Sequence, residues 1–152
     1  MPDAGYPFVT FNFSVEIKVD GISPKICEAA FSDCDGLEQT MEVKTIRQGG
    51  DNASQYRLAG PIALGNLTLK RGMTPNTDLW NWFRATLDDP KLRGTASVVL
   101  LAPDGTTERA RFRLSRCLPI KIKAPALNAK DGAVAIEEMQ LAYETLTFES
   151  PK

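Results

Sequence analysis

The residues best placed for chemistry lie in one short acidic run. Asp33-Cys34-Asp35-Gly36 begins like a calcium-binding loop, in which alternating oxygen ligands and a glycine at a sharp turn surround the ion. Leu37 occupies the next ligand position, where a carboxylate or amide is needed, and the glycine is displaced. We interpret the run as a polar turn before a strand and predict no metal site.

Other residues that could perform catalysis lack partners in the sequence. Glu137 and Glu138 are adjacent, so on a strand they point to opposite faces and do not converge on a substrate. Cys27 and Cys34 have no evident base, and the chain has no histidine, which excludes Ser-His-Asp and Cys-His catalysis. We predict no catalytic residue, no cofactor and no enzymatic activity.

The overall composition narrows the class of protein further. The 152 residues, with 43% hydrophobic residues, suit one globular domain, 1–152. The 18 Lys and Arg against 19 Asp and Glu give no general attraction to nucleic acid. The start of the chain has neither a basic nor an apolar region, and the three cysteines suit reduced thiols. We expect assembly in the cytoplasm without a signal peptide.

Charge is segregated along the chain. Five acids and no base occur from Glu28 to Glu42, and six bases and no acid occur from Arg109 to Lys123. One interpretation is that the two segments pair within one sheet of the same subunit. The other is that they lie on different surfaces and match between subunits, which gives head-to-tail contacts. A basic strand could also line a pore or touch nucleic acid.

Alternation of apolar and polar residues predicts a mainly β chain. Strands are expected at residues 11–20, 37–44, 62–71, 95–102, 107–118 and 133–148. The apolar face switches near Gly65 and near Glu137, which predicts a bulge or bend at the first and a slip at the second. A hairpin turn is expected at Pro103-Asp104-Gly105 and a flexible polar loop over residues 47–56.

One segment, residues 77–88, has helical periodicity. Leu79, Trp80, Phe83 and Leu87 form its apolar stripe, so Trp80 is expected in the core and Trp82 is the candidate interface residue. The predicted fold is therefore a barrel-like or sandwich-like β domain, closed or nearly closed, with one short flanking helix.

Several motifs together resemble a known family. They are Asp35-Gly36-Leu37-Glu38, Arg47-Gln48-Gly49-Gly50, Leu58-Ala59-Gly60, the block from Gly65 to Gly72, Leu79-Trp80-Asn81-Trp82, and the run from Val134 to Glu144. Their order is similar to that in the tail-tube proteins of contractile phage tails and of phage-tail-like extracellular contractile injection systems. Two motifs depart mildly, with Asp35 where the family has Ser and Ala59 where it has Pro.

The resemblance implies an assembly as well as a fold. Six subunits would close into a ring, with sheets joined between subunits around a lumen that can hold cargo. Rings would stack into an inner tube inside a sheath, whose contraction drives the tube through a target membrane. Implied partners are further copies of the chain, a sheath protein, baseplate or tube-initiator proteins and a terminal cap. No specific nucleic-acid partner is evident.

Within that assembly, several residues are candidates for contacts between subunits or rings. The loop around Gly49 is the candidate ring-to-ring contact. For Lys70 and Arg71 the alternatives are a solvated strand end and a salt bridge to Glu38 or Glu42 of another subunit. The full set of candidates is Glu38, Glu42, Gly49, Gly50, Asp51, Asn52, Lys70, Arg71, Trp82, Arg109, Arg111 and Arg113.

Two other functions stay open at this stage. The chain could instead form the tube-initiating ring that joins the tube to the baseplate, because such paralogues are similar in sequence. A small ligand-binding β-barrel is the third alternative, but it requires convergent polar groups in a pocket, and the sequence shows none.

Overall fold

The computed structural model describes residues 12–19, 31–47, 49–50, 53–73, 77–127, 129–130, 132 and 134–150. Within these ranges the chain is mainly β with one helix, which confirms the predicted class. The elements are β1 (Phe13–Val19), β2 (Asp33–Asp35), β3 (Gln39–Ile46), β4 (Tyr56–Leu64), β5 (Leu67–Gly72), α1 (Asp78–Asp88), β6 (Gly94–Leu101), β7 (Glu108–Lys123), β8 (Ile136–Ala142) and β9 (Thr145–Glu149).

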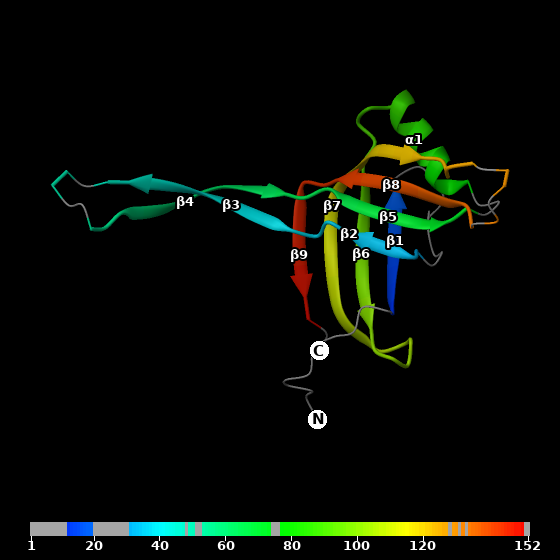
Figure 1. The fold of residues 1–152 in the computed structure, drawn as a ribbon, viewed down its shortest axis with the longest axis horizontal. Coiled ribbons are helices and arrows are strands. Elements are labelled where there is room, and N and C mark those ends of the chain that lie inside the picture. Colours follow the sequence, from blue (N-terminus) through cyan, green and yellow to red (C-terminus); the bar gives the residue numbers. More distant parts are fainter. Residues whose placement is uncertain are drawn as a thin grey trace.

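Two crossed layers of antiparallel strands form the body, and the long strand β7 belongs to both (Figure 1). The first half of β7 pairs with β6 and β9, and β1 pairs with the far side of β6. The second half of β7 pairs with β8, which is followed by β5 and β2. Because β7 passes from one layer to the other, the two layers enclose a common core.

The change of layer occurs at Arg116, which has a φ of 51°. At this point the pairing of β7 with β6 shifts, between Ala96↔Leu114 and Gly94↔Cys117. The Arg116 side chain forms an ion pair with Glu144, whose backbone N–H donates to the Ser115 carbonyl at 3.0 Å. A bulge of this kind bends a strand and increases its twist, which redirects β7 into the second layer.

The core lies between the layers and draws on both. Its buried side chains include Val15, Ile17, Ala96, Val98 and Leu114 from the first layer, and Leu67, Leu69, Met139 and Leu141 from the second. On β1, β5 and β8 these side chains alternate with more exposed neighbours, as the sequence pattern predicts, whereas on β6 the residues from Ala96 to Val99 are all buried.

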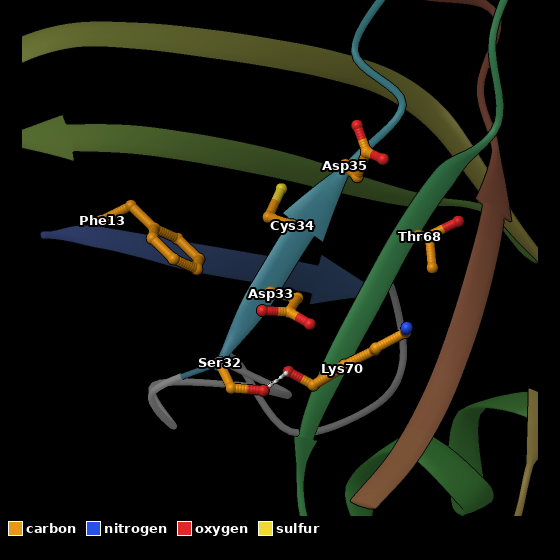
Figure 2. Close-up of a pocket in the computed structure, with 7 residues that line it drawn as sticks. All are labelled: Phe13, Ser32, Asp33, Cys34, Asp35, Thr68 and Lys70. Atoms are coloured by element: carbon orange, nitrogen blue, oxygen red, sulfur yellow. Dashed lines mark hydrogen bonds between the residues drawn. The ribbon is translucent and has the colours of Figure 1, made fainter. Parts of the chain in front are cut away.

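A seam remains between β1 and β2, the two ends of the path of paired strands. No backbone pairing joins these strands in the described part of the chain, so the body is a curved, open sheet rather than a closed barrel. A hollow of about 410 Å³ lies at the seam, lined by β1 and β2 together with β5 (Figure 2).

A two-stranded hairpin, β3–β4, projects far from the body (Figure 1). The single strand predicted over 62–71 is wrong, because β4 ends at Leu64 and β5 begins at Leu67 in a different sheet. The bend predicted at Gly65 separates the two: the Gly65 N–H donates to the Glu38 carbonyl at 3.1 Å. Gly36 packs so closely here that a Cβ atom would lie 2.0 Å from the Asn66 carbonyl oxygen.

The predicted slip near Glu137 is also wrong. Glu137 continues the buried alternation of Met139, Leu141 and Tyr143, whereas Val134 is exposed. The apolar pattern changes phase because a glutamate occupies a core position. The pairing of β8 with β5 continues through Glu137 without a shift in register. The segment 133–148 then divides into β8 and β9, which pair with different halves of β7.

Helix α1 begins and ends within one residue of the expected bounds, and Asp89 is its C-cap. Its buried residues are Leu79 and Trp82, with Phe83 half-buried, whereas Leu87 is 70% exposed. The face of the helix that packs against the body is therefore rotated relative to the predicted apolar stripe. Residues 79, 82 and 83 fit the helical period as well as 79, 80 and 83, so packing against the sheets decided between them.

The turn predicted at Pro103-Asp104-Gly105 connects β6 and β7. The Asp104 carboxylate accepts hydrogen bonds from the backbone N–H groups of Thr106 and Thr107, both at 2.9 Å. A hydrogen bond from the Thr107 hydroxyl is the largest cause that lowers the pKa of Asp104 well below its usual range, and the two backbone hydrogen bonds add to it. The turn is thus held by an ionised side chain, a common arrangement for Asp.

Candidate subunit interface

The hairpin β3–β4, here called the arm, exposes large apolar side chains along both strands. They are Met41, Val43, Ile46, Tyr56, Leu58 and Ile62. Cross-strand pairing places Met41 opposite Ile62 and Ile46 opposite Tyr56. A two-stranded ribbon is marginally stable in water, and exposed apolar residues on it mark a surface that binds a partner.

The arm contains a bulge that fixes its register. Glu42 faces Gly60 and Pro61, between the pairs Met41↔Ile62 and Val43↔Ala59. A Cβ atom at Gly60 would lie 2.3 Å from the Glu42 carbonyl oxygen, so only glycine fits without displacing β3. Glu42 is exposed at this bulge and Glu38 is exposed at the base of the arm.

The tip of the arm is the candidate ring-to-ring loop. Gly49 and Gly50 are exposed there, and Gly50 has a φ of 89°. Asp51 and Asn52, which are also candidates, lie outside the described residues. The loop is shorter than predicted at one end, because Tyr56 already belongs to β4.

Acids of the same chain pair with the basic strand β7. Arg111 pairs with Glu108 (Nε–Oε1 2.8 Å) and Arg113 with Glu149 (2.9 Å). Further along, Lys121 approaches Glu138 at 3.4 Å. The acids of the segment 28–42 are not among these partners, because β2 and β7 are separated by β8 and β5. The predicted pairing of the two charged segments within one sheet is therefore wrong for the described residues.

Arg71 is not a surface residue, which corrects the prediction for it. Its side chain is 2% exposed, and its Nε lies 2.5 Å from Oε1 of Glu137, which is 1% exposed. Lys70 points to the other face of β5, where its Nζ lies 4.0 Å from Glu138. The predicted salt bridges to Glu38 or Glu42 of another subunit thus do not apply to Arg71, which has a partner in its own chain.

Trp82 is likewise misassigned by the sequence. It is 0% exposed and packs in the core, so it presents no surface to another subunit. Trp80 is half-buried, and its indole Nε1–H donates to Oε2 of Glu137 at 2.9 Å. The helix is thereby joined to β8 by the same carboxylate that holds Arg71.

Two strand edges of the first layer, on β1 and β9, have no further strand paired with them in the part of the chain that the structure describes. In the described residues, the ladder hydrogen bonds of β1 go to β6 and those of β9 go to β7. On β9, the Leu146 carbonyl accepts a hydrogen bond from the Gln39 side chain at 3.0 Å, which places the base of the arm beside this edge. Exposed edges of this kind pair readily with a further strand.

The hollow at the seam has few features of a reactive site. Figure 2 shows Cys34 on β2 between Asp33 and Asp35, with Phe13 of β1 across the hollow and Lys70 on β5. Burial, assisted by the charge of Asp35, raises the pKa of the Cys34 thiol to about 12, which suppresses the thiolate. Burial raises the pKa of Cys117 to about 11. Cys27 lies outside the described residues.

Neither a metal cluster nor a membrane-spanning helix occurs in the described segments. No group of three or more His, Cys, Asp or Glu side chains there is placed to hold an ion. Asp33 and Asp35 lie on a regular strand paired with β5, in place of the predicted turn. No helix in the same segments is long and apolar enough to cross a bilayer.

A family model for the T4-like virus tail tube protein gp19 matches residues 9–147. The chain belongs to this tail tube family. Its members are structural proteins of the tail tube, in agreement with the resemblance seen in the sequence motifs.

Solved structures with the same fold extend this result. A chain of the anti-feeding prophage baseplate is 26% identical, with a TM-score of 0.86 over 95% of this tail tube chain and 97% of the other. A chain of the sheath–tube complex of the extracellular contractile injection system PVC is 20% identical, with a TM-score of 0.80 over 97% and 95%. Hcp1 from Flavobacterium johnsoniae is 12% identical, with a TM-score of 0.50 over 91% and 96%. A comparison with curated proteins found no match.

Sequence reasoning missed two features of this tail tube chain. The first is the buried Glu137, although its spacing from Met139 and Leu141 is the period of a strand's inner face. The second is the arm, whose strands alternate in the pattern of a half-buried hairpin although their large apolar side chains are exposed. The spacing of Glu137 could have indicated its burial from the sequence alone. Nothing in the sequence pattern distinguished the exposed arm from a half-buried hairpin.

Proposed function

We propose that this chain is the repeating subunit of the inner tube of a contractile injection particle or phage tail. The observation that carries the proposal is the arm, since six large apolar side chains on a ribbon of two strands require a partner surface. Another copy of the chain supplies that surface when the subunits form hexameric rings and the rings stack.

The strand directions of the first layer support ring closure. Each of the steps β1–β6, β6–β7 and β7–β9 is antiparallel, so β1 and β9 run in opposite directions. The β9 edge of one copy therefore pairs antiparallel with the β1 edge of the next copy in the same orientation. This head-to-tail contact is heterologous, and it closes into a ring.

The arm reaches toward the same neighbour. It leaves the body beside β9, as the Gln39–Leu146 hydrogen bond and Figure 1 show. A copy paired with β9 would consequently also meet the apolar arm. Glu38 and Glu42 at its base and bulge, and Gly49 to Asn52 at its tip, are the residues we assign to contacts between subunits and between rings.

The partners follow from the assembly. We assign a sheath protein to the outer wall of the tube, a baseplate or tube-initiator protein to one end and a cap to the other. Structures of a PVC sheath–tube complex and of the anti-feeding prophage tube-terminating cap contain chains with this fold.

A second candidate is the tube-initiating ring at the baseplate. The observation in its favour is that the 26% identity is to a chain in a baseplate structure, against 20% for the sheath–tube complex. Copy number separates the two, because a tube subunit occupies many rings and an initiator occupies one. Quantitative mass spectrometry of purified particles, scaled to the sheath protein, measures it.

The test of the tube proposal combines electron microscopy with arm variants. Purified wild-type protein should form stacked rings with a central channel. The variant Tyr56→Ser/Ile62→Ser should unfold at the same urea concentration, because the arm lies outside the core, and should form no tubes. The control, Thr40→Ser/Thr45→Ser on the same arm, should assemble normally. A wild-type protein that stays monomeric at high concentration, or tubes from the Tyr56→Ser/Ile62→Ser variant, would contradict the proposal.

A further inference from the structure

The β9 edge of the first layer carries an aromatic side chain that is largely exposed in the single subunit. Phe148 is 56% exposed, although its phenyl group lies 5.2 Å from that of Phe112 on β7. The register continues this row from Phe112 to Val98 and Val15, which are buried in the core. Phe148 therefore lies on the core side of the layer, at the edge where the core ends.

The β1 edge, at the other side of the same layer, borders the hollow of about 410 Å³ at the seam. Figure 2 shows the phenyl group of Phe13 on one side of this hollow and Cys34 of β2 on the other. Both side chains are half-buried and pack against the core, whereas Asp33 and Asp35 are exposed. The hollow thus has an apolar floor and a polar rim.

Ring closure brings these two edges together, and this step rests on the proposed function. When β9 pairs with β1 of the adjacent copy, residues directly opposite each other point to the same side of the sheet. Copies in one ring are related by rotation, so their core sides form one continuous side. Phe148 therefore lies on the same side of the joined sheet as Phe13 and Val15 of the adjacent copy.

Strand direction selects the end of β1 that Phe148 meets. Phe148 is the last residue but one of β9, and Phe13 is the first residue of β1. Antiparallel pairing sets the end of one strand beside the start of the other, which places Phe148 at Phe13 and Leu146 further along, toward Ile17. A slip by one residue is excluded, because it would turn Phe148 away from the core side.

We propose that the hollow at the seam is a socket for Phe148 of the adjacent copy in the ring, and that its phenyl group packs there against Phe13. The site is complete only with two copies, since one chain supplies the socket and the next supplies the side chain that fills it. Burial of this exposed aromatic group favours ring closure, and an aromatic pair adds a preferred geometry. The core of each subunit then continues into the next one.

Assembly measurements test the contribution of Phe148. Phe148→Ala should raise the protein concentration needed for tube formation at least about tenfold, because less apolar area is buried on assembly. Its urea midpoint should stay near that of the wild type, since more than half of the side chain is exposed in the single subunit. Phe148→Leu keeps an apolar group and should recover most of the loss. The control Thr147→Ala, on the other face of β9, should assemble at the wild-type concentration.

Cross-linking tests the position of the partner. The double variant Ser32→Cys/Phe148→Cys places one thiol at the hollow and one on β9. In tubes formed at high protein concentration, a short bismaleimide should join each chain to the next and give a ladder of bands that ends at the hexamer. Dissociated subunits should give no ladder, and Ser32→Cys/Thr147→Cys tubes only a weak one. The parent protein gives the background from its three native cysteines.

The outcomes separate the socket from the proposed function. Failure of the wild-type protein to form tubes overturns the proposed function and the socket with it. Wild-type tubes combined with a Phe148→Ala variant that assembles at the wild-type concentration overturn the socket alone. Equal ladders from the Phe148→Cys and Thr147→Cys double variants do the same, and assign the hollow to another occupant, such as the arm of a copy in the next ring.

Discussion

Arg71 and Glu137 form an ion pair in the core, with Nε and Oε1 2.5 Å apart and both side chains almost inaccessible to water. The second carboxylate oxygen of Glu137 accepts the Trp80 indole hydrogen bond, and the guanidinium carbon lies 5.8 Å from the centre of the Phe31 ring. One carboxylate therefore connects β5, β8 and α1.

Breaking this pair should be costly, since removal of one partner leaves a buried charge without compensation. We expect Arg71→Met to lower the free energy of unfolding by about 3–5 kcal/mol, measured by urea denaturation. The double variant Arg71→Met/Glu137→Gln removes both charges and keeps an acceptor for Trp80, so it should recover at least half of that loss. The control Lys70→Gln, next to Arg71 but only half-buried, should cost less than about 1 kcal/mol. Equal losses in Arg71→Met and Lys70→Gln would show that burial of the pair does not matter.

The two tryptophans of α1 should respond differently to substitution. Trp82→Ala should cost about 3–5 kcal/mol, because it opens a large cavity in the core. Trp82→Phe should cost less, since the Trp82 indole N–H has no hydrogen-bond partner in the described residues. Trp80→Phe should cost about 1–3 kcal/mol, because it removes the donor from a buried carboxylate oxygen.

The same variants test the corrected role of Trp82. Trp82→Phe protein should still form tubes in electron micrographs, because the residue lies in the core. Loss of tubes from a Trp82→Phe protein that retains its wild-type urea midpoint would restore Trp82 as an interface residue.

The corner of β7 offers a test of backbone strain. Arg116 has a φ of 51°, a conformation that β-branched residues avoid, and its side chain pairs with exposed Glu144. Arg116→Gly should change stability by less than about 1 kcal/mol, because relief of strain offsets a weak surface pair. Arg116→Val should cost about 1–3 kcal/mol more than the glycine variant.

Arg113 provides the matched control for this comparison. It lies on the same strand and pairs with the exposed Glu149, but its φ is not in the left-handed region. Arg113→Val should therefore cost no more than Arg113→Gly. The same order of stabilities at both positions would contradict the explanation by backbone strain.

Stability should fall in alkaline solution because of the buried thiols. The folded pKa of Cys34, about 12, and that of Cys117, about 11, lie above the ordinary value of 9.0. An unfolded chain therefore releases these protons at lower pH than the folded chain, so stability present below pH 9.0 is lost as pH rises toward 11 and 12.

Urea midpoints measured from pH 8 to pH 11 check this pH dependence. Cys34→Ala/Cys117→Ala protein should show a shallower decline than the wild type. A decline remains in the variant because burial also raises the pKa of Tyr143. Identical slopes in the two proteins would exclude the thiols as its cause.

Local sequence patterns determined much of the fold. Strict alternation from residue 13 to residue 19 specifies β1, and the helical period with Asp89-Pro90 as its end specifies α1. The Asp104 turn follows from residues that bond to their own backbone neighbours. Each of these signals acts between residues close in the sequence, so it can be read without the tertiary structure. The motifs that identify the family are of the same kind.

Only the tertiary structure decided which polar residues are buried and which apolar ones are not. Arg71 and Glu137 are 66 residues apart, and each segment alone resembles a strand with charged residues facing water. Pairing of β5 with β8 brings the two side chains together inside the core. Likewise, the arm has the alternation of a half-buried hairpin, yet its large apolar side chains are exposed. Burial depends on contacts between distant parts of the chain, and for the arm on contacts with another copy, so the sequence alone could not assign it.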